Sequence, residues 1–286
     1  EMTSSLVGSE MCIRDSYNSE RLKYNQMNYN NDVELDNFCS QCLLVINAVG
    51  PSFKINDKIA LHALRNNCHY IDIGGYGILR DLLKPYEKSI EAQKLCFIIG
   101  VGWMPGISGV FSKTIIETHL NSPENTNFNI YYGAVDNWSY SSTYDLAASS
   151  MGKTRSYVYS HGKEIQVSPF RYTHHKFFPF IGHKKICMPS FDEQLTQLAT
   201  SLKQIRKIST FIMLNDYISM GKFMFIKIFY KHNLNKATLM LQDDYQRLVK
   251  KENKWGSVIC QVSKIEPERK IDTFYYLYTV SYTHLR

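Results

Sequence analysis

The sequence predicts an α/β protein, in which a partial, doubly wound parallel sheet is followed by a second, mixed α/β domain. Two continuous apolar runs, Leu43–Ile46 and Leu95–Gly100, are typical of strands that are buried on both faces of a parallel sheet. Helical patterns separate the apolar runs, and glycine-rich turns follow them, as in a βαβ arrangement. The pattern changes after the polar loop Asn121–Thr126, where alternating strands begin.

The first domain is expected to cover residues 17–122. Its expected elements, in chain order, are a short strand at Val33–Leu35, a short helix capped by Asp36 and running to Cys42, a strand at Leu43–Ile46, a helix at Asp57–Asn67, a strand at Cys68–Ile73, a helix at Ile78–Gln93 bent at Pro85, a strand at Leu95–Gly100 and a helix that ends near Leu120.

The second domain is expected to cover residues 123–279. Its expected elements are a strand at Phe128–Val135, a hairpin that joins Tyr157–Tyr159 to Ile165–Val167, helices at Asp192–Lys207 and Met220–Lys231, and strands at Lys254–Val262 and Thr273–Tyr278. These elements predict a second, mixed sheet with helices.

The two ends of the chain do not read as native protein. Leu6–Ser16 and Val280–Arg286 can both be back-translated into a transposon-library adapter, on opposite strands of the DNA. We therefore assign residues 1–16 and 280–286 to the adapter and exclude them from the fold. The expectation is a gene fragment that was cut at both sides.

Composition limits the classes of function. The chain has 286 residues with 44% hydrophobic and 21% charged residues, which is ordinary for a globular protein. Its net charge of +7 is spread without a dense basic block, so nucleic acid is not an expected partner. The cysteines are scattered, as in reduced cytoplasmic proteins, and the Cys39–Cys42 spacing has no second pair to complete a metal site. Neither a metal nor membrane association is expected.

Three strand ends carry unusual turns: Asn47–Pro51, Asp72–Gly75 and Gly100–Gly109. Ligands of open α/β sheets bind outside the carboxyl ends of the strands, and glycine there lets the backbone approach a ligand closely. Gly106 opens a helix whose N–H groups could hold an anion. Together these turns predict a binding site at one edge of the sheet.

The same turns resemble the cofactor domain of the saccharopine dehydrogenase family. The resemblance rests on Asn-Ala-x-Gly-Pro at residues 47–51, on His-Tyr-Ile-Asp-x-Gly-Gly at 69–75 and on Gly-x-Gly-x-x-Pro-Gly-Ile-Ser at 100–108. It covers Val33 to about Pro169 and includes the hairpin around His161–Lys163. The family's phosphate-binding loop and the residue that selects NAD or NADP do not occur in this sequence, and truncation is the simpler explanation.

The resemblance implies a Rossmann-type domain, a nicotinamide cofactor (NAD or NADP) and hydride transfer at a C–N bond of an amino-acid-derived small molecule. A homodimer is one option for its assembly. The implied catalytic residue is Asp72, as a general acid or base. The implied cofactor-binding residues are Asn47, Ala48, Val49, Gly50, Pro51, Gly74, Gly102, Pro105 and Gly106.

Several alternatives stay open from the residues alone. Asn47 could cap a strand end, and Asp72 could cap the turn that precedes two glycines. Gly50 is glycine either because a side chain would collide with the dinucleotide or because its backbone needs a positive φ. A Rossmann-like scaffold protein without catalysis is the alternative function, and a membrane-associated enzyme would depend on Phe223–Tyr230 alone.

Overall fold

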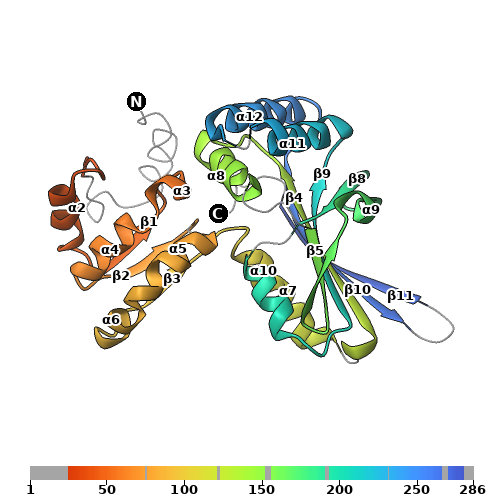
Figure 1. The fold of residues 1–286 in the computed structure, drawn as a ribbon, viewed down its shortest axis with the longest axis horizontal. Coiled ribbons are helices and arrows are strands. Elements are labelled where there is room, and N and C mark those ends of the chain that lie inside the picture. The colour runs from red at the N-terminus through yellow and green to blue at the C-terminus, as the bar shows by residue number, and fades with distance from the viewer. Residues whose placement is uncertain are drawn as a thin grey trace.

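The structure, a computed structural model, describes residues 25–74, 76–120, 123–151, 156–190, 193–230, 232–265 and 270–279. The two segments that we assigned to the adapter, residues 1–16 and 280–286, lie outside these residues. The chain folds around two sheets, one of three strands and one of eight, and helices pack on each (Figure 1). It is a mixed α/β protein, as the sequence predicts.

The three-stranded sheet is parallel, in the order β1-β2-β3. The elements of this part are α2 (Asp32–Cys39), β1 (Leu44–Asn47), α3 (Ser52–Ile55), α4 (Lys58–Arg65), β2 (His69–Asp72), α5 (Tyr76–Leu83), a 3-10 turn (Lys84–Tyr86), α6 (Glu87–Ala92), β3 (Phe97–Ile99) and α7 (Ile107–His119). The sequence therefore located all three strands, and the bend it predicted at Pro85 is the 3-10 turn between α5 and α6.

Among the described elements, helices cover one face of this sheet and none covers the other. Val45 and Tyr70 lie side by side on that face and pack under α2, α4 and α5 in one hydrophobic core. The other face carries Leu44, Ile46 and Ile98, which are 41%, 61% and 46% exposed. The prediction that the Leu43–Ile46 strand is buried on both faces is therefore wrong for this chain, because no described element covers the second face.

The segment before β1 is helical where a strand was expected at Val33–Leu35. Asn31 caps α2, since its side-chain oxygen accepts hydrogen bonds from the N–H groups of Val33 (3.1 Å) and Glu34 (3.4 Å). Leu35 then points into the core. Asp36 lies inside the helix and does not cap it, so that prediction was also wrong.

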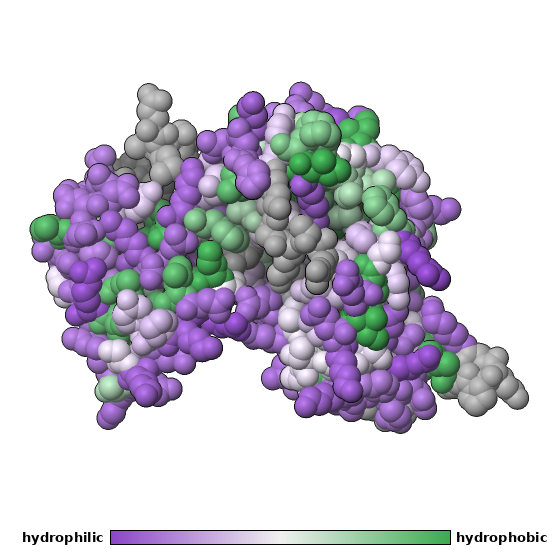
Figure 2. Space-filling view, viewed as in Figure 1, coloured by the Kyte–Doolittle hydropathy of each residue, from purple (hydrophilic) through white to green (hydrophobic). Residues whose placement is uncertain are grey.

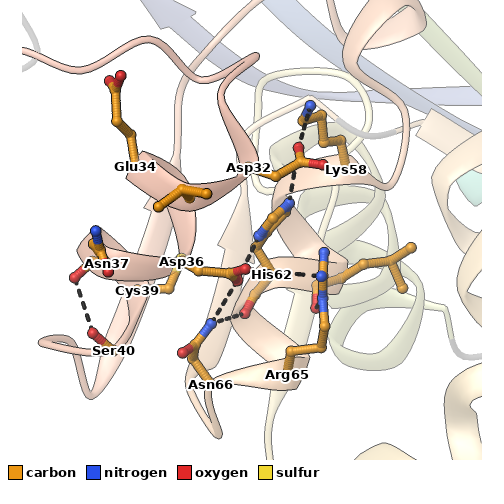
Figure 3. Close-up of polar contacts among 12 residues, drawn as sticks. Asp32, Glu34, Asp36, Asn37, Cys39, Ser40, Lys58, His62, Arg65 and Asn66 are labelled. Atoms are coloured by element: carbon orange, nitrogen blue, oxygen red, sulfur yellow. Dashed lines mark hydrogen bonds and ion pairs between the residues drawn. The ribbon is translucent and has the colours of Figure 1, made fainter.

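Buried His62 of α4 joins α2 to α4 (Figure 3). Its Nδ1 lies 2.6 Å from Oδ1 of Asp36, and its Nε2 lies 3.5 Å from Oδ1 of Asp32. Asn66 donates to the same Asp36 oxygen at 3.0 Å. The hydrogen bond from His62 is the largest cause that lowers the pKa of Asp36. These contacts hold the first helix of the domain on its core.

The eight-stranded sheet has the strand order β11-β10-β4-β9-β5-β6, and the β7–β8 hairpin joins it at β9. Its elements are a 3-10 turn (Pro123–Asn125), β4 (Thr126–Val135), α8 (Tyr140–Met151), β5 (Ser156–Ser160), β6 (Lys163–Val167), α9 (Pro169–Tyr172), β7 (His174–Phe178), β8 (His183–Pro189), α10 (Glu193–Ser201), β9 (Lys207–Leu214), α11 (Tyr217–Phe229), α12 (Leu234–Val249), β10 (Trp255–Ile265) and β11 (Lys270–Thr279).

Two layers of helices pack on this sheet (Figure 1). One face of β4 packs Phe128 and Ile130 against α7 and α10. The opposite face packs Tyr131 against the end of α12 and the β7–β8 hairpin. Helix α7 belongs to the first domain by sequence, yet its Ile115 and Ile116 bury against the second sheet and tie the two parts together.

The sequence missed the centre of this domain. The helix predicted at Asp192–Lys207 ends at Ser201, and Lys207 begins β9, which pairs with β4 in parallel. The α8 and α12 helices and the β7–β8 hairpin were not predicted either. The hairpin of β5 and β6 was predicted and is confirmed, with the left-handed residues His161 and Gly162 at its turn.

Candidate functional site

The carboxyl ends of the three parallel strands bring the predicted site residues together. Asn47 and Asp72 are cross-strand partners, and Asp72 in turn pairs with Ile99. Both polar side chains are almost fully buried, with 5% of Asn47 and 3% of Asp72 exposed. The turns that follow the strands therefore start from one line across the sheet, as the sequence predicts for a ligand-binding edge.

Asp72 is held by a closed set of hydrogen bonds. Its Oδ2 accepts from the Tyr70 hydroxyl (2.5 Å) and from the Asn47 amide (2.8 Å), and its Oδ1 accepts from the Gly74 N–H (2.9 Å). Burial, followed by the charge of Asp72, raises the pKa of Tyr70, so this hydroxyl stays a donor. Both carboxylate oxygens have partners inside the protein, and a substrate would have to replace one of them.

Asn47 orients the first turn. It also caps the end of strand β1, which was the alternative role considered for it. Its Oδ1 accepts from the Val49 N–H at 3.0 Å while its amide donates to Asp72 and, at 3.1 Å, to the Tyr70 oxygen. Ala48 and Val49 project from this turn as exposed side chains. Tyr70 is the member that sequence reasoning missed; its place two residues before Asp72 on the same face of β2 was the available signal.

The glycine-rich turn between β3 and α7 folds tightly on itself. Gly102 donates to Pro105 O at 3.0 Å, and Gly106 has a φ of 126°, where a Cβ would strike the Gly102 carbonyl. Gly106 donates its own N–H to Oε1 of Gln194 at 2.9 Å. Ile107 and Ser108 donate to backbone carbonyls of the same turn. These three N–H groups are therefore occupied in this structure, which departs from the expectation that they are unpaired and could hold an anion.

Helix α8 of the second domain contacts the first domain directly after the Asn47–Pro51 turn. Asp145 of α8 accepts from the N–H groups of Ser52 (2.9 Å) and Phe53 (3.1 Å), which are the first residues of α3. The pKa of the Asp145 carboxyl group is raised, and desolvation by burial is the largest cause. Asp145 was not predicted as a site residue, because α8 itself was not predicted.

Gly50 is glycine for a reason that neither alternative anticipated. Its φ is not in the left-handed region, so backbone strain does not require glycine there. A Cβ at this position would lie 2.9 Å from the Cβ of Ser141 on α8. The close approach of the two domains therefore explains this glycine without any ligand. The neighbouring Gly50–Pro51 peptide is cis.

A second bridge lies between α5 and α10. The guanidinium Nη2 of Arg80 lies 2.5 Å from Oε1 of Glu193 at the start of α10, next to Gln194. Glu193 also fills the space beside Gly77, where a Cβ would strike its carboxylate. The first two described residues of α10 thus contact the first domain beside the candidate edge.

Hydrophobic side chains surround this edge. Val49, Ile73 and Val101 are 39%, 46% and 48% exposed. Figure 2 shows a hydrophobic surface at this end of the sheet, facing the space between the two domains. Such a surface beside a few convergent polar groups suits the flat ring of an organic ligand.

The remaining candidates lie elsewhere. Within the described residues, no three His, Cys, Asp or Glu side chains gather into a possible metal site. Cys39 is buried, and burial raises its pKa to about 11. No described helix has the length and hydropathy needed to cross a membrane. The apolar surface of α11 is nevertheless exposed over Phe225, Ile228 and Phe229 (Figure 2).

Comparison with known proteins yields structural likenesses only. No protein-family model and no curated protein matches the chain. Among solved structures, "putative oxidoreductase yvaA from Bacillus subtilis" aligns with 93% of this chain and 72% of its own, at 7% identity and a TM-score of 0.36. This likeness is too weak to assign a family or an activity. The fold itself places the chain among mixed α/β proteins with a Rossmann-like parallel sheet.

Proposed function

We propose that this chain is part of an NAD(P)-dependent oxidoreductase of the saccharopine dehydrogenase type, which transfers hydride at a C–N bond of an amino-acid-derived substrate. One observation carries the proposal: the motif residues Asn47, Asp72 and Gly100–Gly106 meet along the carboxyl edge of a parallel sheet. In Rossmann-type sheets that edge holds the dinucleotide.

The uncovered sheet face supports the proposal that further chain completes this domain. Strand β1 pairs only with β2 among the described strands, and its outward residues Leu44 and Ile46 are exposed. Parallel sheets bury both faces in nearly all known folds. An upstream strand beside β1, with the glycine-rich phosphate loop and its helix, would cover apolar surface that no described element covers.

The nicotinamide end of the coenzyme fits the exposed side of the first turn. Ala48 and Val49 present small apolar side chains there, next to the buried Asn47–Asp72 pair. We place the substrate beside this turn, at the margin of its contact with α8, where Ser141 lies against Gly50 and Asp145 binds the first residues of α3. Asp72 would position the turn through Gly74, and would exchange a proton only if one of its present partners moved.

The alternative is a Rossmann-like scaffold without catalysis. It is favoured by the closed hydrogen bonding of Asp72, whose two oxygens are both used inside the protein. Hydride transfer from reduced coenzyme to a product would exclude the scaffold, and an upstream gene sequence without a glycine-rich loop would favour it.

The test uses the gene product extended upstream, with tryptophan introduced at an exposed valine. Val49→Trp would place an indole over the proposed nicotinamide position, and it is expected to weaken NADPH or NADH binding at least tenfold, about 1.4 kcal/mol. The matched control is Val33→Trp, since Val33 is 68% exposed on α2, on the helix-covered side of the sheet. Equal coenzyme affinity in the two variants would remove the Asn47–Pro51 turn from the site.

A further inference from the structure

A cavity opens on the second sheet, on the face that carries Tyr131. The pairing registers place side chains of neighbouring strands in rows across this face. The row through Ile259, Tyr131 and Phe211 is apolar and belongs to the hydrophobic core. The next two rows are polar: one runs through Gln261, Asn129 and Ser209, and the other through Ser263, Asn127 and Lys207.

The polar rows form the floor of the cavity, which has a volume of about 560 Å³. This volume is within the usual range for a small-molecule site. The walls come from β7, through His174 and Lys176, and from α9, through Arg171 and Tyr172. The His174 ring stands edge-on to Phe211, with ring centroids 4.9 Å apart, and completes an aromatic wall.

Positive charge dominates the lining. Arg171, Lys176, Lys207 and Lys270 all line the cavity, and no carboxylate does. Asp272 pairs with Lys270 at 3.2 Å, and its charge also acts on Lys176. Within the described part of the chain, Arg171, Lys176 and Lys207 form no ion pair with a carboxylate. Arg171 and Lys207 therefore face the cavity without an ion-pair partner, and Lys176 has only the more distant charge of Asp272.

Lys176 shows that this charge is kept at a cost. Desolvation by burial is the largest cause that acts on the pKa of its ammonium group, and this pKa is lowered. The ammonium donates to Oε1 of buried Gln261 at 2.7 Å and lies over the rings of Tyr131 and Phe274. The neutral amide, the two rings and the charge of Asp272 compensate this burial only in part, because the pKa stays lowered, and a bound anion would add to the compensation.

An unsatisfied polar atom lies in the same floor. Oδ1 of Asn127 is buried and has no hydrogen-bond partner among the described residues. Buried polar groups rarely lack partners in folded proteins, and those that do often face a ligand or water.

We propose that this cavity binds a small phosphate ester whose body carries hydroxyl groups. A phosphate group presents up to two negative charges on three oxygens, which suits several separated cations better than a single carboxylate does. The amide and hydroxyl floor suits the hydroxyl groups of the ester, and the aromatic wall suits its carbon skeleton.

This site is separate from the proposed coenzyme edge. All of its lining residues belong to the second domain, and Figure 1 places α9, β9 and β11 on the side of the molecule away from the three-stranded sheet. It would be a second site, for an effector or for another reactant. Its test does not depend on coenzyme binding.

The test is a calorimetric titration of pyrophosphate into the chain in about 0.15 M salt, where surface charges are screened. Arg171→Gln and Lys207→Gln each remove one lining cation and are expected to weaken binding at least tenfold. Lys184→Gln removes an exposed charge of β8 outside the lining and should leave binding unchanged. Lys207 also lies over the Tyr172 ring, so its substitution could alter the local fold as well as the charge. The melting temperature of each variant shows whether it does. Arg171→Gln removes a lining cation without this contact and provides an independent test.

Saturable binding at one site per chain, weakened in both cavity variants and not in the control, supports the proposal. It is overturned if pyrophosphate fails to bind at about 10 mM, or if all variants bind it equally. Citrate that binds as tightly as pyrophosphate would also overturn it, because the site would then bind carboxylates as well as it binds phosphates. So would a single-stranded oligonucleotide that binds more tightly and loses affinity in the same variants.

Discussion

Substitution of Gly50 by alanine tests the contact between the two domains. The new Cβ would lie 2.9 Å from the Cβ of Ser141, whereas carbon atoms pack at about 3.5–4.0 Å. An overlap of this size in packed surroundings costs about 1–3 kcal/mol. The loss of glycine's freedom in the unfolded chain offsets about 0.4–1 kcal/mol of that cost. We therefore expect a net loss of about 1 kcal/mol in the free energy of unfolding.

A double-mutant cycle separates this clash from other effects. Ser141→Gly removes the Cβ and the hydroxyl that the new methyl group would meet, so the double variant should recover about 1–2 kcal/mol relative to the sum of the single variants. Urea unfolding followed by the fluorescence of Trp138, which lies just before α8, measures all four proteins. A coupling energy below about 0.3 kcal/mol would show that Gly50 and Ser141 are not in contact and would refute the reasoning.

Two further predictions concern stability. Although burial alone would raise it, hydrogen bonds from Arg247 and the Ser219 N–H hold the pKa of Asp216 at about 2, against 3.8 when free. The pKa of Asp216 is lowered by 3.8 − 2, about 1.8 units, which corresponds to about 2.4 kcal/mol of stability. Because a third of the side chain is exposed and solvent screens its charge, we reduce this contribution to about 1 kcal/mol. This stability is present above about pH 4 and lost progressively between about pH 4 and 2; the difference in unfolding free energy between Asp216→Asn and the parent should therefore be about 1 kcal/mol at pH 7 and less than half of that at pH 2.5. On the first sheet, Ile46→Lys should change the unfolding free energy by less than about 0.5 kcal/mol and reduce dye binding to the bare face, while Val45→Ala on the covered face should cost about 1–3 kcal/mol. Equal losses at the two positions would show that the second face is packed.

The first domain was largely predictable because its signals are local. Each apolar run is followed by a glycine turn, and these two features fix where a strand of a parallel sheet ends. The approach of Asn47 to Asp72 follows from that topology without any knowledge of distances. The hydrogen bond from Tyr70 to Asp72 was not predicted, although the two residues share a face of β2, because a tyrosine on a strand is usually a core residue.

The second domain was predicted poorly because its elements depend on tertiary contacts. The segment after Ser201 continues a helical pattern, yet Lys207–Leu214 becomes a strand because it fills the place beside β4. The contacts of Asp145 and Gln194 with the first domain join residues 88 to 93 positions apart. The basic cavity likewise gathers residues from α9, β7, β9 and β11, and each lysine taken alone reads as a solvated surface residue.

We propose that the carboxyl edge of the three-stranded sheet is the coenzyme side of a Rossmann-type domain, which is completed by chain upstream of β1. Titration of NADPH and NADH into the present chain and into the upstream-extended gene product tests it most directly. The account predicts binding of at least one coenzyme by the extended protein at about 10 µM or tighter, and no binding by the present chain at about 1 mM, because the N–H groups of the described helix at Gly106 are already occupied. Micromolar binding by the present chain alone, or none by an extended protein with an intact glycine-rich loop, would contradict it.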